Sequence, residues 1–226
     1  MLDVEKRRNH PPPPGGETGA RERRTITGDK AMDTPISPFK FQRMSWMLSL
    51  RDLWGSPQDT LSEVDIRAGF RVLDYGCGTG SFTFAAAKRA GPEGKVYALD
   101  IHPLALEKIQ KGAVKRGLVN IETVLTSCIT QVEPSSIDVV LFYFVLHWLT
   151  DPDCVLGELH RVLKSNGLLS FRDPYMKEEE ILQAITQKGL FRLAEKREKS
   201  YLFVKAGEKK EDAAVSPEPI KGETLS

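Results

Sequence analysis

The glycine-rich turn that follows Tyr75 constrains the fold more than any other part of the chain. A short apolar run beginning at Arg71 leads into the turn, and an alanine-rich segment begins at Ser81. Glycines occupy alternate positions in it: Gly76, Gly78 and Gly80. They permit positive φ angles and leave no Cβ in the way of a ligand. The pattern predicts a buried strand, a tight turn and a helix, with room for a small molecule against the main chain.

Two acidic residues accompany this turn. Asp74 lies two residues before the first glycine, and Asp100 ends the next apolar run, which begins at Lys95. In a doubly wound sheet both strand ends open on the same edge, where ligands bind. We therefore expect the two carboxylates to face one site of about the size of an adenosine.

Strand-like and helix-like segments alternate along the rest of the chain. Strands are expected at 71–75, 95–100, 121–126, 137–143, 168–172, 191–196 and 201–205, and helices at 81–90, 103–117, 151–163 and 177–188. Each helix shows apolar residues at helical spacing, and the strands are short apolar runs bounded by turn residues. The alternation predicts an α/β fold with a mostly parallel, doubly wound sheet and right-handed crossovers.

Length and composition set the domain organisation. With 226 residues and 40% hydrophobic content, the chain is expected to form one domain, residues 34–206. Residues 1–33 and 207–226 are polar and are expected to be disordered tails. Aromatic and apolar residues at near-helical spacing predict an N-terminal helical lid within residues 34–68, although these side chains could equally pack on the sheet edge.

Charge, hydropathy and cysteine content exclude some classes of function. A net charge of +1 gives no whole-chain bias toward nucleic acid or membranes. The sequence has no apolar run long enough to span a membrane and begins with charged residues, so a cytoplasmic protein is expected. Three irregularly spaced cysteines argue against a disulfide framework and fit a reducing compartment.

Four motifs resemble the class I S-adenosylmethionine-dependent methyltransferases, most closely the ubiquinone/menaquinone-biosynthesis type. They are Val72–Gly80, Ala98–Ile101, Ile137–Leu141 with Leu146–Trp148, and Glu158–Gly167. Nicotinamide-dependent oxidoreductases also carry a glycine-rich turn, but their spacing is Gly-x-Gly-x-x-Gly. The resemblance implies a three-layer Rossmann-like sheet of seven strands with an antiparallel last strand, and S-adenosylmethionine as the cofactor.

The resemblance also implies roles for particular residues. Asp74 would bind the methionine ammonium, Asp100 the ribose hydroxyls, and Ile101 the adenine. Many relatives carry an acid after the third strand, where this chain has Ser127 and Cys128 instead. The remaining residues expected around the methionine part are Tyr75, Gly76, Cys77, Gly78, Gly80 and Tyr143.

The segment after the fourth strand would bring the acceptor to the sulfonium. His147 could act as a base or orient an acceptor hydroxyl, although a structural role is the alternative, and Tyr143 is the second catalytic candidate. Because a sulfonium methyl is already activated, a base is optional and the motifs leave the acceptor unidentified. A small molecule is expected, and a second subunit could complete an open site.

Two alternatives accompany this interpretation. A non-catalytic cofactor-binding subunit with the same fold would be expected to have lost the glycine turn or the ribose acid, and both are present. Methyltransferases that act on arsenic use cysteines as ligands, so a metalloid site at Cys77, Cys128 and Cys154 is an alternative. No paired ligand spacing appears among them, and no metal is expected.

Overall fold

The computed structural model of the chain describes residues 56–207. Nearly all of the two expected tails, and residues 34–55 of the expected lid, lie outside these described residues.

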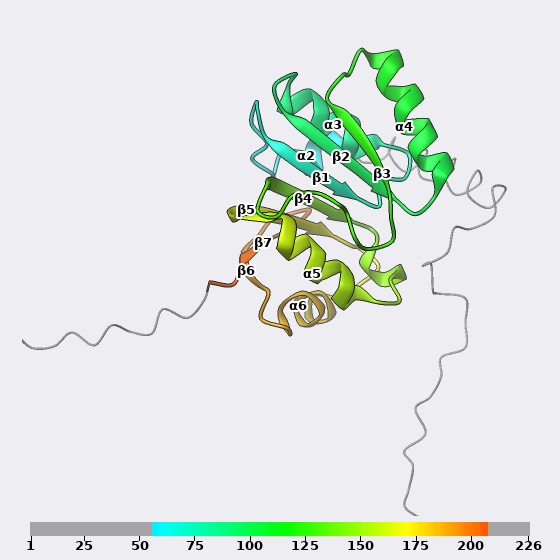
Figure 1. Ribbon diagram of the computed structural model, residues 1–226. Coiled ribbons are helices and arrows are strands. Elements are labelled where there is room, and N and C mark those ends of the chain that lie inside the picture. The colour runs from blue at the N-terminus through cyan, green and yellow to red at the C-terminus, as the bar shows by residue number, and fades with distance from the viewer. Residues whose placement is uncertain (1–55, 208–226) are drawn as a thin grey trace, which may run out of the picture.

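A seven-stranded sheet forms the centre of the described chain (Figure 1). Its strands are β1 (Arg71–Tyr75), β2 (Lys95–Asp100), β3 (Ile121–Leu125), β4 (Ile137–Tyr143), β5 (Leu163–Arg172), β6 (Phe191–Lys196) and β7 (Tyr201–Lys205). They lie in the order β3-β2-β1-β4-β5-β7-β6, and β1 to β5 are mutually parallel. Strand β7 runs antiparallel to both β5 and β6. The expected sheet is confirmed, including its antiparallel last strand.

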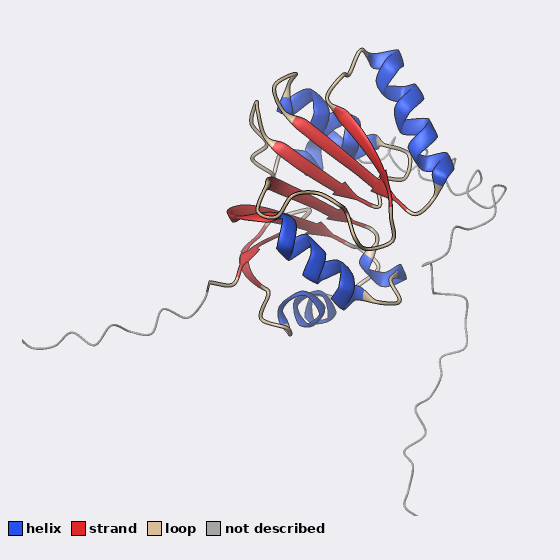
Figure 2. Cartoon of the chain, in the orientation of Figure 1, coloured by secondary structure: helices blue, strands red, loops and turns tan. Residues whose placement is uncertain are grey.

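Helices cover both faces of the sheet (Figure 2). They are α2 (Pro57–Leu61), α3 (Ser81–Ala90), α4 (Pro103–Arg116), α5 (Pro152–Val162) and α6 (Glu178–Thr186). Side chains of β1 alternate between the faces: Val72 packs with α2 and α3, and Leu73 packs with α5 and α6. Because both faces are buried, most positions of the central strands are apolar, as is typical of parallel sheets.

Strand β5 begins earlier than the sequence indicates. A helix through residue 163 and a strand from residue 168 were expected, but α5 ends at Val162 and β5 starts at Leu163. The pairing of β4 with β5 is shifted before Val139, as in a β-bulge. Gly167 belongs to this irregular stretch, where an added Cβ would lie 2.7 Å from Leu163 Cδ1. Because the irregular pairing accommodates Gly167, β5 continues through this glycine and does not begin after it.

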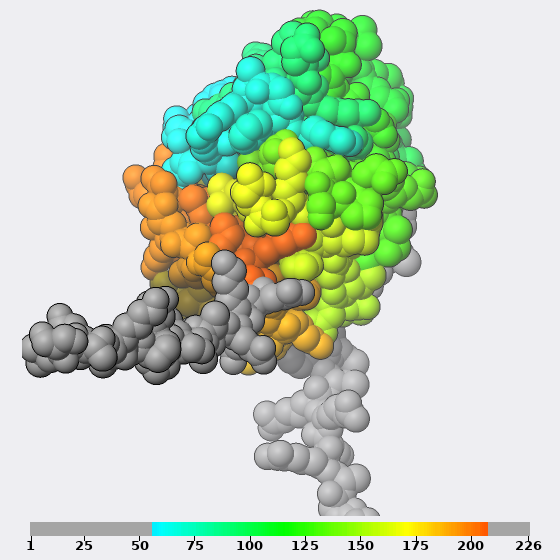
Figure 3. Space-filling model, turned by 60° about the vertical axis from the view of Figure 1, so that its left-hand side comes forward, coloured from blue at the N-terminus to red at the C-terminus, as the bar shows by residue number. Residues whose placement is uncertain are grey.

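The order of the strands in the sheet also determines which strands lie at each end of the molecule. The segments around β1 to β3 fill one end of the molecule, and the last strands, in orange, lie toward the other (Figure 3). Strands β2 and β3 lie on one side of β1, and the chain then returns to place β4 on the other side. The carboxyl ends of β1 and β4 therefore frame the expected site. Within residues 56–207, no helix combines the length and apolar character needed to cross a membrane.

Candidate active site

The glycine turn is fixed by backbone hydrogen bonds and close packing. The N–H of Gly76 donates to the carbonyl of Leu99 at 2.8 Å, which joins the turn to β2. Gly76 and Gly80 have φ angles of +75° and +86°. An added Cβ at Gly76 would lie 2.3 Å from Val145 Cγ2, and one at Gly80 would lie 2.3 Å from Ile109 Cδ1. Glycine is therefore required at both positions by φ and by packing inside the protein, before any ligand is considered.

Asp74 lies at the carboxyl end of β1 and is almost wholly buried, with 3% of its surface exposed. Its Oδ2 accepts a hydrogen bond from Thr83 Oγ1 of α3 at 2.5 Å. Burial raises the pKa of Asp74 to about 7, and the nearby negative charge of Asp100 adds to this rise. A cation beside Asp74 would oppose both effects and favour its ionised form.

Asp100 anchors the turn from the end of the neighbouring strand. Its Oδ2 accepts the N–H of Gly78 at 3.0 Å, and its Oδ1 accepts the N–H of His102 at 2.8 Å. Burial raises the pKa of Asp100, and these two backbone hydrogen bonds oppose the rise. Asp100 and the following Ile101 are both half-buried, so they line the accessible edge next to the turn. The structure thus brings the two predicted carboxylates and the glycine turn together.

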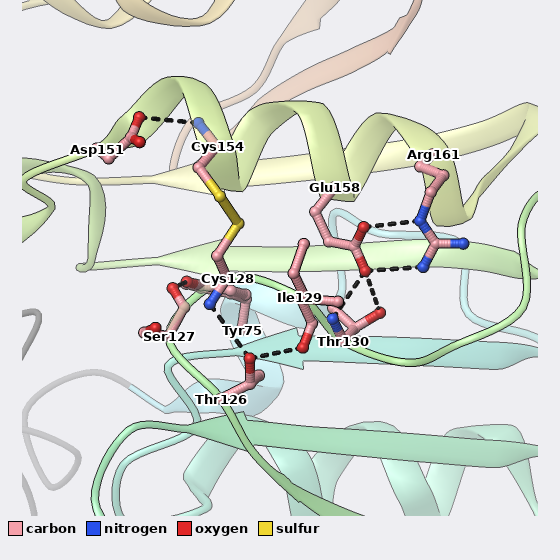
Figure 4. Close-up of a disulfide and its surroundings, with 10 residues drawn as sticks. All are labelled: Tyr75, Thr126, Ser127, Cys128, Ile129, Thr130, Asp151, Cys154, Glu158 and Arg161. Carbon is pink, nitrogen blue, oxygen red and sulfur yellow. Dashed lines mark hydrogen bonds and ion pairs between the residues drawn. A yellow bond between two sulfur atoms is a disulfide. The ribbon is translucent and has the colours of Figure 1, made fainter.

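The loop after β3 closes this edge from the other side. The N–H of Thr126 donates to the carbonyl of Asp100 at 3.1 Å, and Tyr75 Oη donates to the carbonyl of Ser127 at 2.6 Å (Figure 4). Tyr75 is buried, so its hydroxyl supports the loop from within the core. Ser127 is exposed, whereas the N–H of Cys128 donates to Thr126 Oγ1 at 3.2 Å. Of the two residues expected in place of the adenine-binding acid, Ser127 is thus the one with an exposed side chain.

A disulfide between Cys128 and Cys154 joins this loop to the first turn of α5 (Figure 4). Asp151 caps the same turn by accepting the N–H of Cys154 at 3.0 Å. The number and spacing of the cysteines argued against a disulfide framework and did not predict this bridge, because residues 26 apart in the sequence meet only once the sheet has formed. The bridge also removes the argument for a reducing compartment that rested on unpaired cysteines.

The third cysteine has a different environment. Cys77 is buried and packs with Phe84 and Ile109. Burial raises the pKa of its thiol well above the usual value, so the thiol is an apolar neighbour rather than a nucleophile. Among the described residues, no group of three or more His, Cys, Asp or Glu side chains is placed to hold a metal ion.

Glu158 of α5 fixes the far end of the same loop. Its Oε1 accepts the N–H and the hydroxyl of Thr130 at 2.7 and 2.6 Å (Figure 4). Arg161 binds both carboxylate oxygens, at 2.7 and 2.8 Å, and also donates to the carbonyl of Val132. Hydrogen bonds from Arg161, followed by those from Thr130, lower the pKa of Glu158 to about 2. The loop after β3 is therefore held to α5 by a buried carboxylate and its hydrogen bonds in addition to the disulfide.

Tyr143 lies in the core rather than at the edge. It is 4% exposed, its hydroxyl is hydrogen-bonded to Ser170 at 2.7 Å, and its ring contacts Phe82. Burial raises the pKa of its hydroxyl. Strand alternation explains the difference, because Tyr143 points to the face covered by α3. The described structure gives no support to a catalytic or cofactor-binding role for Tyr143.

His147 lies in the segment that leaves the end of β4. Phe144 adopts a positive φ of +61°, and the 3-10 helix η1 (Leu146–Trp148) follows. His147 Nδ1 lies 2.5 Å from Oδ2 of Asp173, which comes directly after β5. Sequence reasoning missed Asp173, although the rule that singled out Asp74 and Asp100, an acid at the end of a parallel strand, applies to it as well.

Comparison with known proteins places this site in context. The family model of a methyltransferase domain matches residues 66–210. A demethylmenaquinone methyltransferase from Geobacillus stearothermophilus is 33% identical over 129 residues, 57% of this chain and 55% of the relative. The ubiquinone/menaquinone biosynthesis C-methyltransferase UbiE from Burkholderia vietnamiensis is 34% identical over 108 residues, 48% of this chain and 44% of the relative.

The chain therefore spans about half the length of the curated relatives it matches. The crystal structure of a SAM-dependent methyltransferase from Aquifex aeolicus matches with 27% sequence identity and a TM-score of 0.61, covering 74% of this chain and 96% of that chain.

Proposed function

The chain belongs to the methyltransferase domain family, and we propose that it transfers a methyl group from S-adenosylmethionine to a small-molecule acceptor. The observation that carries this proposal is the joint arrangement of Asp74, Asp100 and the glycine turn at one sheet edge.

The residues at this edge fit the charge pattern of the cofactor. Two largely desolvated carboxylates favour a cation, and S-adenosylmethionine carries an ammonium and a sulfonium. We assign the ammonium to Asp74 and the ribose hydroxyls to Asp100, whose oxygens each accept one backbone N–H and retain lone pairs for further donors. Ile101 and Ser127 would border the adenine, and the Gly76–Gly80 main chain the methionine part.

The bound cofactor would supply an activated methyl group for in-line displacement. The residues of this chain then have to align the acceptor and, where the reacting atom carries a proton, remove it. We assign that second task to His147, because its ring lies at the carboxyl end of β4, the strand next to β1.

A small-molecule acceptor is supported by the names of the relatives, which refer to menaquinone and ubiquinone biosynthesis. A cytoplasmic location and a second subunit at the site stay predictions.

The decisive experiment is calorimetric titration of the full chain with S-adenosylmethionine, S-adenosylhomocysteine and NADH in parallel. We expect micromolar binding of the first two and none of NADH. Binding of NADH alone would overturn the proposal in favour of a nicotinamide-dependent oxidoreductase.

Variants at Asp100 test the site itself. Asp100→Ala should weaken S-adenosylmethionine binding by ~2 to 4 kcal/mol, because two ribose hydroxyls lose a charged acceptor. Since Asp100 also holds the N–H groups of Gly78 and His102, Asp100→Asn is needed as a variant of the same shape. Asp65→Ala, which removes an exposed carboxylate paired with Arg67, is the matched control. Unchanged affinity in both Asp100 variants would remove Asp100 from the site.

A further inference from the structure

We propose that Asp173 positions His147 as a base, by keeping the imidazole proton on Nδ1 and leaving the Nε2 lone pair available to an acceptor. This inference deepens the proposed function and rests on it for the identity of the reaction. The arrangement of the two side chains, however, can be tested without any acceptor.

Asp173 is held so that it can serve only as an acceptor toward His147. Its side chain is fully buried, and its Oδ2 lies 2.5 Å from His147 Nδ1. Its other oxygen, Oδ1, accepts the backbone N–H of Tyr175 at 3.2 Å. With both oxygens engaged, the carboxylate has a fixed orientation, and an ionised carboxylate has no proton to donate. In the neutral imidazole, Nδ1 must therefore carry the proton.

The imidazole ring contacts two aromatic side chains. The ring centroids of Trp148 and Tyr175 lie 4.8 and 5.0 Å from that of His147. Tyr175 belongs to the segment that Asp173 anchors, so the same carboxylate fixes the hydrogen bond and one of the flanking rings. Together with the hydrogen bond to Asp173, these contacts orient the ring, as a base that must meet an acceptor requires.

The second nitrogen of the ring is open. Among residues 56–207, Nε2 has no hydrogen-bond partner, and Arg71 Nε is the only buried side-chain nitrogen or oxygen without one. The His147 side chain is 16% exposed. An accessible Nε2 with a lone pair is an acceptor for protons rather than a donor.

This arrangement favours acceptors whose reacting atom carries a proton, such as a hydroxyl or an enol. As that atom gains the methyl group, its proton passes to Nε2, and the buried carboxylate stabilises the resulting imidazolium. The proton later leaves Nε2 for water, which restores the neutral ring. Asp173 is assigned a role only through His147 and no contact with the acceptor or the cofactor, so it is a positioning residue.

Asp173→Asn should reverse the tautomer of His147. The carboxamide oxygen is expected to keep the N–H of Tyr175, which directs the amide NH₂ group at His147 Nδ1. Nδ1 must then accept, so the proton moves to Nε2 and the base is lost. Asp153→Asn is the matched control, since Asp153 is exposed and paired with Lys188 on the surface.

The test is ¹⁵N NMR of the imidazole nitrogens in the full-length chain at a pH where the ring is neutral. We expect the proton on Nδ1 in the wild type and in Asp153→Asn, and on Nε2 in Asp173→Asn. Acylation of His147 by diethyl pyrocarbonate, followed by peptide mass spectrometry with His160 as internal reference, should slow by about fivefold or more in Asp173→Asn.

The outcomes separate this inference from the proposed function. A wild-type His147 with its proton on Nε2 would overturn the inference even if Asp173→Asn failed to fold, and so would an unchanged tautomer in a folded variant. S-adenosylhomocysteine affinity should be the same in the wild type and in Asp173→Asn. Failure of the wild type to bind that ligand would count against the proposed function alone.

Discussion

Removal of the Cys128–Cys154 bridge should destabilise the protein by an amount set by the loop that the bridge closes. The two cysteines are 26 residues apart in the sequence. In the chain-entropy treatment, closing a loop of this length lowers the entropy of the unfolded chain by an amount equivalent to about 3.5 kcal/mol at 25 °C. For a domain of this size, that corresponds to a fall in melting temperature of roughly 7 to 14 °C.

The assay is urea unfolding with and without a reducing agent, applied to the wild type, Cys128→Ser, Cys154→Ser and the double variant. The two single variants and the double variant should lose the same stability, because either substitution already breaks the bridge. The reducing agent should lower the stability of the wild type and of Cys77→Ala, but not that of the double variant. Thiol titration of the unreduced, denatured wild type should find one free cysteine.

Two results would refute this reasoning. Three free thiols in the unreduced chain would mean that the bridge does not form in solution. Additive losses from the two single substitutions would mean that each serine acts through its own local packing rather than through a shared bond.

Two further predictions concern buried carboxylates. Because burial raises the pKa of Asp74 to about 7, the folded state holds a proton that the unfolded state has released, and stability should fall as pH rises from about 4 to 7. Asp74→Asn should therefore raise the free energy of unfolding at pH 8, as measured by urea unfolding, and weaken S-adenosylmethionine binding, as measured by calorimetry. A variant that is no more stable than the wild type at pH 8 would contradict this. Hydrogen bonds from Arg161 lower the pKa of Glu158 to about 2, so its stabilisation is present above about pH 4.3 and is lost as pH falls toward 2. Glu158→Gln should cost about 1 to 3 kcal/mol at pH 7 and progressively less below pH 4 in urea unfolding, and an equal cost at both pH values would exclude a charge effect.

The order of strands and helices could be predicted from the sequence because its signals are local. Apolar runs, helix caps and glycines lie within a few residues of the element that they define. The expected bounds of β1, β2, β4, α3 and the two last strands agree with the structure. The bounds of β5 were missed, because the bulge near Gly167 depends on how β5 pairs with β4 rather than on its own residues.

Some residues of the candidate site could likewise be predicted from local sequence, whereas others meet only through tertiary contacts. Local residue patterns were enough to predict the glycine turn and the two acids at strand ends, because each follows directly from the strand before it. The alternation of side chains along β4 places Tyr143 in the core. Tertiary contacts bring His147 to Asp173 and Cys128 to Cys154. These contacts join residues far apart in the chain, and they exist only once parallel strands have aligned their carboxyl ends. Local residue patterns specify helices and strands, whereas the pairing of those elements decides which side chains meet.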